Sequence, residues 1–332
     1  MNNDELVIFF NKLIKKLALG EIIEGPIQVT GGLTHKMYKI FTSRGKYIVK
    51  LLNPNIMKRT TALANFKRAD ILEETLKSNN INAIYSLIFN NSKLQKIDNQ
   101  YLYIYEWFEG KTLTSKEITE EHCIIIAKSI AEIHNINLIN KNNQYEEKHI
   151  NFNKYLEYKS PINKLLKDNI DLLNNSIKMY NNSIKKIPPV LSICHNDMDI
   201  KNVLWNNHDY KIIDLECLDY SNPYLELFEL ALCWTGFEEC NINYELLNIF
   251  LKTYFENTNL NKNIDWESIY YVNSNRIDWL EYNIKRVLMI ETNSKEEQEI
   301  GINEVIKTIK QIKYYNEIKE KLLNNIKKII EE

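Results

Sequence analysis

The sequence has few features of a secreted or membrane-embedded protein. Its 332 residues include five cysteines, an odd number without C-x-x-C spacing, which is typical of reduced cytoplasmic thiols and offers no zinc motif. No apolar run approaches the roughly 20 residues that a membrane-spanning helix needs. Asp4 and Glu5 precede a short apolar run that lysines soon interrupt, which argues against a signal peptide. We expect a cytoplasmic protein with no membrane partner.

An excess of charge of one sign is also absent. The net charge is −2, from 42 basic and 44 acidic side chains, whereas nucleic-acid-binding proteins usually show a clear basic excess. The length allows two domains with separate cores, and no internal repeat or Pro/Gly/Ser-rich linker divides the chain. We expect no nucleic-acid partner, and a monomer or weak dimer.

The first third of the chain predicts a β-rich unit with two helices. Apolar residues recur at helical spacing over Glu5–Leu19 and Thr61–Lys77. Runs of β-branched and aromatic residues, separated by turn signals, predict strands at Ile27–Thr30, Met37–Thr42, Lys46–Leu52, Ile84–Phe89 and Tyr101–Phe108.

The remainder of the chain is mainly helical in pattern. Helices are predicted over Ile118–His134, within Phe152–Lys186 and through most of the chain after Pro223. Three short strands are predicted at Leu191–His195, Val203–Trp205 and Tyr210–Leu215. The sequence therefore predicts an α+β fold with a small β-rich N-terminal lobe over 1–105, a hinge over 106–110 and a larger helical lobe over 111–332.

One motif indicates phosphoryl transfer. His195-Asn196-Asp197 with Asn202 fits H-x-D-x-x-x-x-N, the spacing of the kinase catalytic loop. The reaction needs a carboxylate that accepts the proton of the attacking hydroxyl, and oxygen ligands for Mg²⁺. Asp197 is the predicted base and Asn202 a predicted metal ligand, while His195 is expected to hydrogen-bond the loop backbone. The alternative is a solvated polar loop.

A second carboxylate follows on the next strand. Asp214 ends the apolar run Lys211-Ile212-Ile213, and a bare carboxylate at the end of a buried strand is costly without a cation. Glu216, two residues later, would point to the same side of a strand. We predict that Asp214 and Glu216 bind the metal.

Residues upstream are suited to a nucleotide. Gly31-Gly32 lies between two predicted strands, where glycine lets backbone N–H groups approach phosphates, although a plain hairpin turn fits these two residues equally well. Two strands on, the run Lys46-Tyr47-Ile48-Val49-Lys50 ends in a lysine, much like the V-A-I-K strand of kinases, whose lysine contacts the α- and β-phosphates. We predict Lys50 as the phosphate contact.

Lys50 should need an acidic partner on the next helix. Glu73 falls within the apolar stripe of Thr61–Lys77, and a carboxylate on a buried face needs a cation. We therefore favour Glu73 over Asp70 and Glu74, which lie at the edges of the stripe. The alternative is that Glu73 is a solvated surface residue.

The segment Tyr103–Gly110 reads as an edge strand leading into a turn. In a two-lobed kinase this backbone would hydrogen-bond the adenine, so Glu106 and Phe108 are predicted cofactor-binding positions. The same residues could equally form a core strand.

These motifs together resemble the aminoglycoside phosphotransferase and choline kinase superfamily of kinase-like small-molecule phosphotransferases. The resemblance rests mainly on C-H-N-D-M-D-I-K-N-V-L-W and I-I-D-L-E, and more weakly on G-G-L-T-H-K-M-Y, Y-I-V-K, E-W-F-E-G and A-E-I-H. It implies a bilobed protein-kinase-like fold that uses ATP (or GTP) and Mg²⁺. It also implies roles for Asp197 as base, Asn202 and Asp214 as metal ligands, Lys50 at the phosphates, and Gly31, Gly32 and Thr34 in the phosphate loop.

The small-molecule branch fits better than protein kinases. The metal-binding segment reads D-L-E, not D-F-G, and no A-P-E-like segment follows it. Relatives often have an Asp a few residues after Pro223, usually structural, where this chain has Glu226.

The acceptor of the phosphate is much less defined. Acids among the C-terminal helices would suit an aminoglycoside-like polycation, and aromatics would suit choline or an amino alcohol. Ordinary amphipathic helices also carry both kinds of side chain. The candidate acceptor residues are Asp219, Trp234, Trp279, Glu281 and Tyr282.

Three functions remain open. The first is an ATP-dependent phosphotransferase acting on a hydroxyl of a small polar acceptor. The second is a catalytically silent nucleotide-binding scaffold of kinase ancestry, such as a coat or assembly protein. The third is a protein kinase.

Overall fold

The computed structural model describes residues 3–29, 35–141, 145–207, 209–273, 275–290, 292 and 294–331. The chain divides into two compact units, each with its own core. The first contains Met1–Thr114 and His195–Asp219, and the second contains Ser115–Cys194 and Tyr220–Glu332. The hinge predicted at 106–110, with its flanking lobes, stays a prediction.

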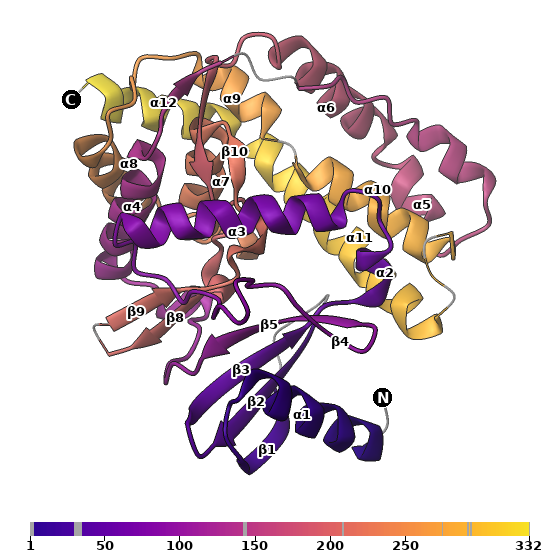
Figure 1. Ribbon diagram of the computed structural model, residues 1–332. Helices are drawn as coiled ribbons and strands as arrows, with labels where there is room; N and C mark the ends of the chain where they lie inside the picture. The colour runs from indigo at the N-terminus through magenta and orange to yellow at the C-terminus, as the bar shows by residue number, and fades with distance from the viewer. Residues whose placement is uncertain are drawn as a thin grey trace. The chain divides into compact units, whose positions relative to one another are not determined.

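The first unit is built on a five-stranded sheet in the order β1-β2-β3-β5-β4 (Figure 1). All four neighbouring pairs are antiparallel. The strands agree with four of the predicted runs, apart from their ends, and add β4. They are β1 (Ile22–Val29), β2 (Lys36–Thr42), β3 (Gly45–Leu51), β4 (Gln95–Ile97) and β5 (Gln100–Glu106).

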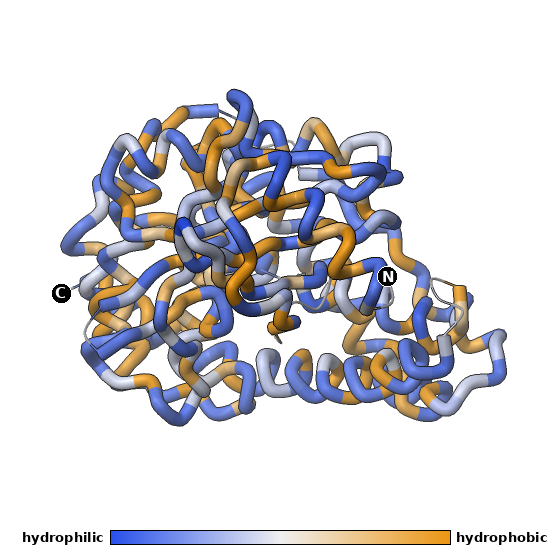
Figure 2. Tube along the Cα trace, turned by 60° about the horizontal axis from the view of Figure 1, so that its bottom comes forward, coloured by the Kyte–Doolittle hydropathy of each residue, from blue (hydrophilic) through white to orange (hydrophobic). Residues whose placement is uncertain are grey.

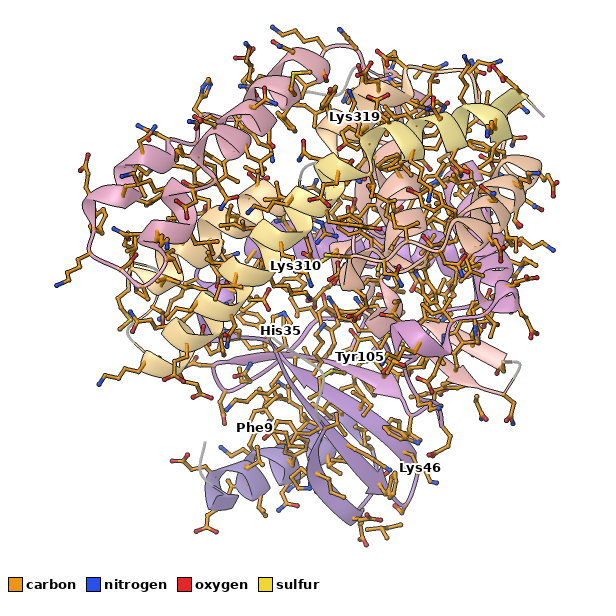
Figure 3. All side chains as sticks on the ribbon, turned by 180° about the vertical axis from the view of Figure 1, so that it is seen from behind. Phe9, His35, Lys46, Tyr105, Lys310 and Lys319 are labelled. Carbon is orange, nitrogen blue, oxygen red and sulfur yellow. The ribbon has the colours of Figure 1, made fainter. Side chains whose placement is uncertain are left out.

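Helix α1 (Asn3–Leu17) covers one face of this sheet, which confirms the first predicted helix. Its buried side chains, Phe10 among them, pack against sheet residues such as Tyr38 and Ile104. The rings of Phe10 and Tyr38 meet edge to face with centroids 5.4 Å apart. Figure 3 labels Phe9 in this layer, with His35 and Lys46 at opposite ends of the sheet.

Helix α3 (Ala62–Ser78) covers the opposite face, after the short helix α2 (Pro54–Met57). Phe66 packs against Leu52 and Tyr103, and successive residues of a strand point to opposite faces. The two helices thereby enclose β3 and β5, and the predicted helix is confirmed.

The strand predicted over Ile84–Phe89 is wrong. This segment makes only isolated bridges because its backbone alternates between two partners. Ile84 donates its N–H to the carbonyl of Ile212 at 2.8 Å, and Leu87 donates to that of Ile104 at 2.8 Å. A continuous ladder would need one partner strand along its whole length.

A hairpin of β8 (Val203–Asn206) and β9 (Asp209–Ile212) completes the first unit. The predicted strand Tyr210–Leu215 ends early, at Ile212. Ala83 forms a parallel bridge with Ile212, so the hairpin is joined to the segment after α3.

The second unit is mainly helical, and the strands concentrate in the first, which confirms the predicted α+β class. Apolar and polar residues alternate along the helices (Figure 2), so each presents an apolar stripe. Short strands also occur here, in the order β10-β7-β6. The elements are α4 (Glu120–Asn135), β6 (Ile139–Asn140), α5 (Asn163–Lys167), α6 (Ile170–Ser183), β7 (Val190–Cys194), β10 (Asp219–Ser221), α7 (Pro223–Cys233), α8 (Tyr244–Asn257), α9 (Trp266–Val272), α10 (Asn275–Val287), α11 (Lys295–Glu317) and α12 (Lys319–Glu331).

None of the helices in the described ranges is both long and apolar enough to cross a bilayer.

A buried polar cluster joins α4, α7 and α8. His134 is fully buried, and its Nε2 lies 2.7 Å from the carboxylate of Glu226. Its Nδ1 lies 2.7 Å from the hydroxyl of Tyr254, and the thiol of Cys194 lies 3.6 Å from Nε2. Each polar group is therefore satisfied inside the core. Glu226 holds the ring of His134, in agreement with the structural role expected for this position.

We predict that Glu226→Ala lowers the free energy of unfolding by about 3 kcal/mol or more, because it leaves a buried imidazole without its carboxylate partner. Urea denaturation followed by circular dichroism would measure this. Glu256→Ala is the matched control, since Glu256 is an exposed acid on α8, and its loss should change stability by at most about 0.5 kcal/mol. Equal effects of the two changes would contradict the structural role of the pair.

Candidate functional site

The segment after β7 forms the loop that the H-x-D motif predicts. His195 is fully buried, and its Nε2 lies 3.0 Å from the carbonyl oxygen of Ile213. Its Nδ1 accepts the backbone N–H of Asp197 at 3.3 Å. One ring nitrogen therefore carries the proton and the other a lone pair, as in neutral imidazole. His195 hydrogen-bonds the loop backbone, as predicted.

Both oxygens of the Asp197 carboxylate are held. Asn202 donates from Nδ2 to Oδ2 at 2.9 Å, and Lys201 lies 3.4 Å from Oδ1. Lys201 is itself held by Asp199 at 2.9 Å. Burial raises the pKa of Asp197 above its ordinary value, and the charge of Lys201 opposes that change. With 37% of its side chain exposed, Asp197 is fixed in orientation and still open to solvent.

Asp214 lies just after β9 in a backbone conformation that few residues other than glycine adopt. Its φ is 65° and its ψ is 51°, and such strain is concentrated at functional sites. A 3₁₀ turn over Leu215–Cys217 follows. The prediction that Asp214 and Glu216 share one side of a strand is therefore wrong. The left-handed residue and the tight turn bring the two carboxylates to the same cation instead.

That cation is Lys50 on β3. Its Nζ lies 2.5 Å from Oδ1 of Asp214 and 2.6 Å from Oε2 of Glu216. Only 5% of the Lys50 side chain is exposed. Burial would lower the pKa of Lys50, but the charges of Asp214 and Glu216 outweigh it and raise the pKa overall. The structure thus brings Lys50 to two acids that lie more than 160 residues later in the sequence.

Glu216 is held from a second direction. His35 lies with Nε2 3.1 Å from Oε1 of Glu216. Burial would raise the pKa of Glu216, but the hydrogen bond of His35 and the charge of Lys50 lower it to about 2. No sequence pattern indicates this role for His35, because it stands in a short polar segment without periodicity.

The predicted pairing of Glu73 with Lys50 is not what the structure has. Glu73 is buried on α3, as predicted, but it accepts hydrogen bonds from Ser86, including one of 2.8 Å from the hydroxyl. It also forms an ion pair of 3.3 Å with buried Lys93. Lys93 comes from a loop after α3, so no helical or strand pattern in the sequence could indicate it as the partner.

The two alternative acids also have other partners. Asp70 accepts a hydrogen bond from the Tyr103 hydroxyl at 3.0 Å, and burial raises its pKa to about 6 despite that bond. Glu74 lies 2.7 Å from Lys93. Each of the three acids considered for Lys50 is therefore engaged elsewhere.

The remaining predicted cofactor residues are less defined. Gly31, Gly32 and Thr34 lie outside the described residues. Glu106 closes β5 in an exposed position, and Phe108 is half-buried just beyond it. The part of Glu106 and Phe108 in nucleotide binding stays a prediction.

The residues present fit a magnesium ion. Asn202, Asp214 and Glu216 offer amide and carboxylate oxygens, the hard ligands that Mg²⁺ prefers. Oε2 of Glu216 is buried and, in the described part of the chain, accepts no hydrogen bond of good geometry. The ammonium of Lys50 lies beside this oxygen, so a cation already occupies the position between the carboxylates of Asp214 and Glu216.

Two of the predicted acceptor residues, Trp234 and Asp219, have different surroundings. Trp234 is fully buried, so its prediction as an acceptor contact is wrong: it packs in the core at the end of α7. Asp219 is bound by Arg68, with distances of 3.1 and 2.8 Å. The side chain of Asp219 is nevertheless 43% exposed, so its part in acceptor binding stays a prediction.

On α10 the two predicted aromatic acceptor residues are exposed neighbours. Trp279 is 42% and Tyr282 41% exposed, with ring centroids 5.6 Å apart. Glu281 accepts a hydrogen bond of 2.5 Å from the hydroxyl of Tyr155, and Trp279 donates to Glu304 at 3.0 Å. The two rings therefore lie together with the carboxylate of Glu304, whereas Glu281 has other partners, and the part of these residues in acceptor binding stays a prediction.

A cavity of about 50 Å³ also lies among the helices of the second unit. It is lined by tyrosine, amide and charged side chains, and none of the predicted acceptor residues contributes to it. Among its lining residues are Asn175, Glu229, Tyr270, Asn273, Arg276 and Tyr315.

Arg276 joins this cavity to an ion cluster. It lies 2.9 Å from Glu238 and donates to Gln311 at 2.8 Å. Lys307 also contacts Glu238, at 3.0 Å. Burial would raise the pKa of Glu238, but Arg276 and Lys307 lower it to about 2.

A family model described as the phosphotransferase enzyme family matches residues 27–255. The chain belongs to this family. The match includes Lys50, Asp197, Asn202 and Asp214. A comparison with the curated proteins finds no match.

Solved structures of phosphotransferases share the fold. The chain is 14% identical to a spectinomycin phosphotransferase solved with ADP and spectinomycin, with a TM-score of 0.61 over 93% of this chain and 94% of that one. It is 18% identical to an ethanolamine kinase of Plasmodium vivax, at 0.61 over 92% and 89%. It is 17% identical to a choline kinase of Streptococcus pneumoniae, at 0.61 over 93% and 99%. The predicted kinase-like fold is confirmed.

The ion cluster of Glu238 predicts an acid-dependent stability. Because its pKa is lowered in the folded state, Glu238 stabilises the fold above its ordinary pKa, and this contribution is lost as the pH falls toward about 2. Between about pH 5 and about pH 2, the free energy of unfolding should therefore fall further in the native protein than in Glu238→Gln. After allowance for solvent screening, the expected difference is about 1–2 kcal/mol. Urea titrations over this range would measure it.

Glu239→Gln is the matched control, because Glu239 is the next residue and is exposed. It should keep the native pH dependence. If Glu238→Gln kept it as well, the ion cluster would not affect stability in acid.

Proposed function

We propose that this member of the phosphotransferase family transfers the γ-phosphate of ATP to a hydroxyl of a small polar acceptor. The observation that supports this best is the grouping within the first unit of Lys50 with Asp214 and Glu216, and of Asp197 with Asn202. These are the residue types that phosphoryl transfer needs, in the order in which a kinase presents them.

Asp197 has the role of catalytic base in this proposal. Its carboxylate is oriented by Asn202 and Lys201, so it can accept the proton of the acceptor hydroxyl and aim the oxygen at phosphorus. Positioning of this kind contributes much of the rate enhancement in phosphoryl transfer. The raised pKa of Asp197 also makes it a better proton acceptor than an exposed aspartate.

Lys50 is the proposed contact of the nucleotide phosphates. Its ammonium lies on a strand in a buried position, and its flexible stem would let it exchange the carboxylates of Asp214 and Glu216 for the nucleotide phosphates. Mg²⁺, held by Asn202, Asp214 and Glu216, would neutralise charge on the phosphates. The silent scaffold stays the alternative, because the presence of these residues does not itself establish turnover. A protein kinase is the third possibility.

The acceptor is proposed to be aminoglycoside-like or an amino alcohol such as choline. Support comes from the neighbouring rings of Trp279 and Tyr282 on α10, with the carboxylate of Glu304 3.0 Å from the indole nitrogen of Trp279. Such a group suits a cationic ligand, through cation–π attraction and a nearby carboxylate. The names of the similar structures, which include a choline kinase and an ethanolamine kinase, are consistent with an amino-alcohol acceptor.

We predict that Asp197→Asn keeps Mg·ATP binding and loses phosphoryl transfer by a factor of about 10²–10⁴, because the amide cannot accept the hydroxyl proton. Lys50→Ala should instead weaken nucleotide binding itself. Isothermal titration with Mg·ATP and coupled detection of ADP release would separate the two effects. Asp98→Asn, an exposed carboxylate of the same unit, is the control and should match the native protein.

Phosphoryl transfer that survives in Asp197→Asn would remove Asp197 as the base. A native protein that binds Mg·ATP and releases no ADP with any acceptor would favour the silent scaffold. Failure of the native protein to bind nucleotide would refute the proposed function.

We predict ADP release with at least one cationic acceptor in a panel of choline, ethanolamine, homoserine, thiamine, aminoglycosides and sugars. For that acceptor, Trp279→Ala should raise KM about 2- to 30-fold, the range expected from a lost cation–π contact, while kcat changes little. Tyr158→Ala serves as the control, because Tyr158 is an exposed aromatic of the same unit. An unchanged KM in Trp279→Ala would exclude this surface.

A further inference from the structure

Glu216 is fixed by two different basic side chains, one on each carboxylate oxygen. His35 contacts Oε1 at 3.1 Å, and Lys50 contacts Oε2 at 2.6 Å. The exposed fractions of the side chains are 4% for His35, 16% for Glu216 and 5% for Lys50. The carboxylate therefore has little freedom to rotate, and each oxygen has its own neighbour.

The proton on His35 can be placed from its contacts. The backbone N–H of Asn53 donates to Nδ1 at 2.9 Å, so Nδ1 bears a lone pair and Nε2 bears the proton. His35 therefore donates from Nε2 to Glu216. Asn53 lies two residues beyond the end of β3, the strand that carries Lys50, so His35 is held by a residue close in sequence to that strand.

The two contacts of Glu216 differ in kind. The Nε2–H of His35 can hold Oε1 whether or not another cation approaches Oε2. Lys50, by contrast, occupies Oε2 as a cation, and a metal ion would take the same place. Ligating carboxylates are commonly oriented by a hydrogen bond on the oxygen that does not meet the metal, and loss of such a bond typically costs 10- to 100-fold in metal affinity.

We propose that His35 is a positioning residue of the metal site: it anchors Oε1 of Glu216 so that Oε2 faces the cation. His35 also directly follows the predicted phosphate loop in the sequence. This inference rests on the proposed function, since it assumes that Glu216 binds Mg²⁺.

Two variants of similar chemistry separate the contacts of His35. Asparagine can still accept the N–H of Asn53, but its side chain is too short to reach Glu216. Glutamine is longer and can place its amide N–H where Nε2 of histidine lies. His35→Asn therefore removes the contact with Glu216, and His35→Gln restores it.

The experiment measures Mn²⁺ binding to the ADP complex by electron paramagnetic resonance, and ADP binding in EDTA by titration calorimetry. We expect His35→Asn to weaken Mn²⁺ binding about 10-fold or more, with ADP affinity in EDTA within twofold of native. His35→Gln should recover most of the metal affinity. In a Glu216→Gln background, His35→Asn should have no further effect on Mn²⁺ binding.

Native metal affinity in His35→Asn would overturn the proposal. So would an equal loss of ADP binding in EDTA, which would make His35 a structural residue of the loop, or a full effect of His35→Asn in the Glu216→Gln background. If the native protein bound neither ADP nor Mn²⁺, the result would refute the proposed function, and this inference would fall because it rests on that function. Normal binding by the native protein, with no effect of His35→Asn, would remove this inference alone.

Discussion

The ion triad of Lys50, Asp214 and Glu216 is the interaction on which the site of the first unit depends. Taking charged groups out of water is costly, and the cost is recovered only when each has a close partner of opposite sign. One ammonium lies within 2.6 Å of two carboxylates, so the group keeps a net negative charge. The position of β3, the left-handed backbone of Asp214 and the following turn all serve to bring these groups together.

Much of this site could be predicted from sequence, because its members follow short spacings. Asp197 and Asn202 are five residues apart in one loop, and local geometry brings them together at 2.9 Å. Lys50 and Asp214 each end a run with a strand pattern. Lys50, Asp197 and Asp214 follow one another in the order in which a kinase presents these residue types. That order and the strand patterns are enough to predict that these distant residues form one site.

The errors have a common physical cause. Burial of Glu73 could be read from the apolar stripe of α3, but the identity of its partner could not, since Lys93 and Ser86 come from loops without periodicity. The segment Ile84–Phe89 has the composition of a strand, yet its hydrogen bonds go to two different neighbours. Trp234 was chosen for its chemistry, whereas its place at the end of an apolar helix buries it. In each case the tertiary partner decided the outcome.

The charges around Glu216 also keep its carboxylate in the ionised form that a metal ion needs. Two acids near one another tend to raise each other's pKa, and a protonated carboxyl binds Mg²⁺ poorly. In this protein Lys50 and His35 lower the pKa of Glu216 to about 2, so the carboxylate stays ionised at neutral pH although it is buried. A lysine can leave such a pair without breaking any backbone contact, because its charge sits on a flexible stem. The histidine cannot, since the chain fixes its other nitrogen at Asn53. Under the proposed function, Lys50 is the cation that can move to the nucleotide phosphates. The hydrogen bond from His35 stays and keeps the carboxylate of Glu216 in place.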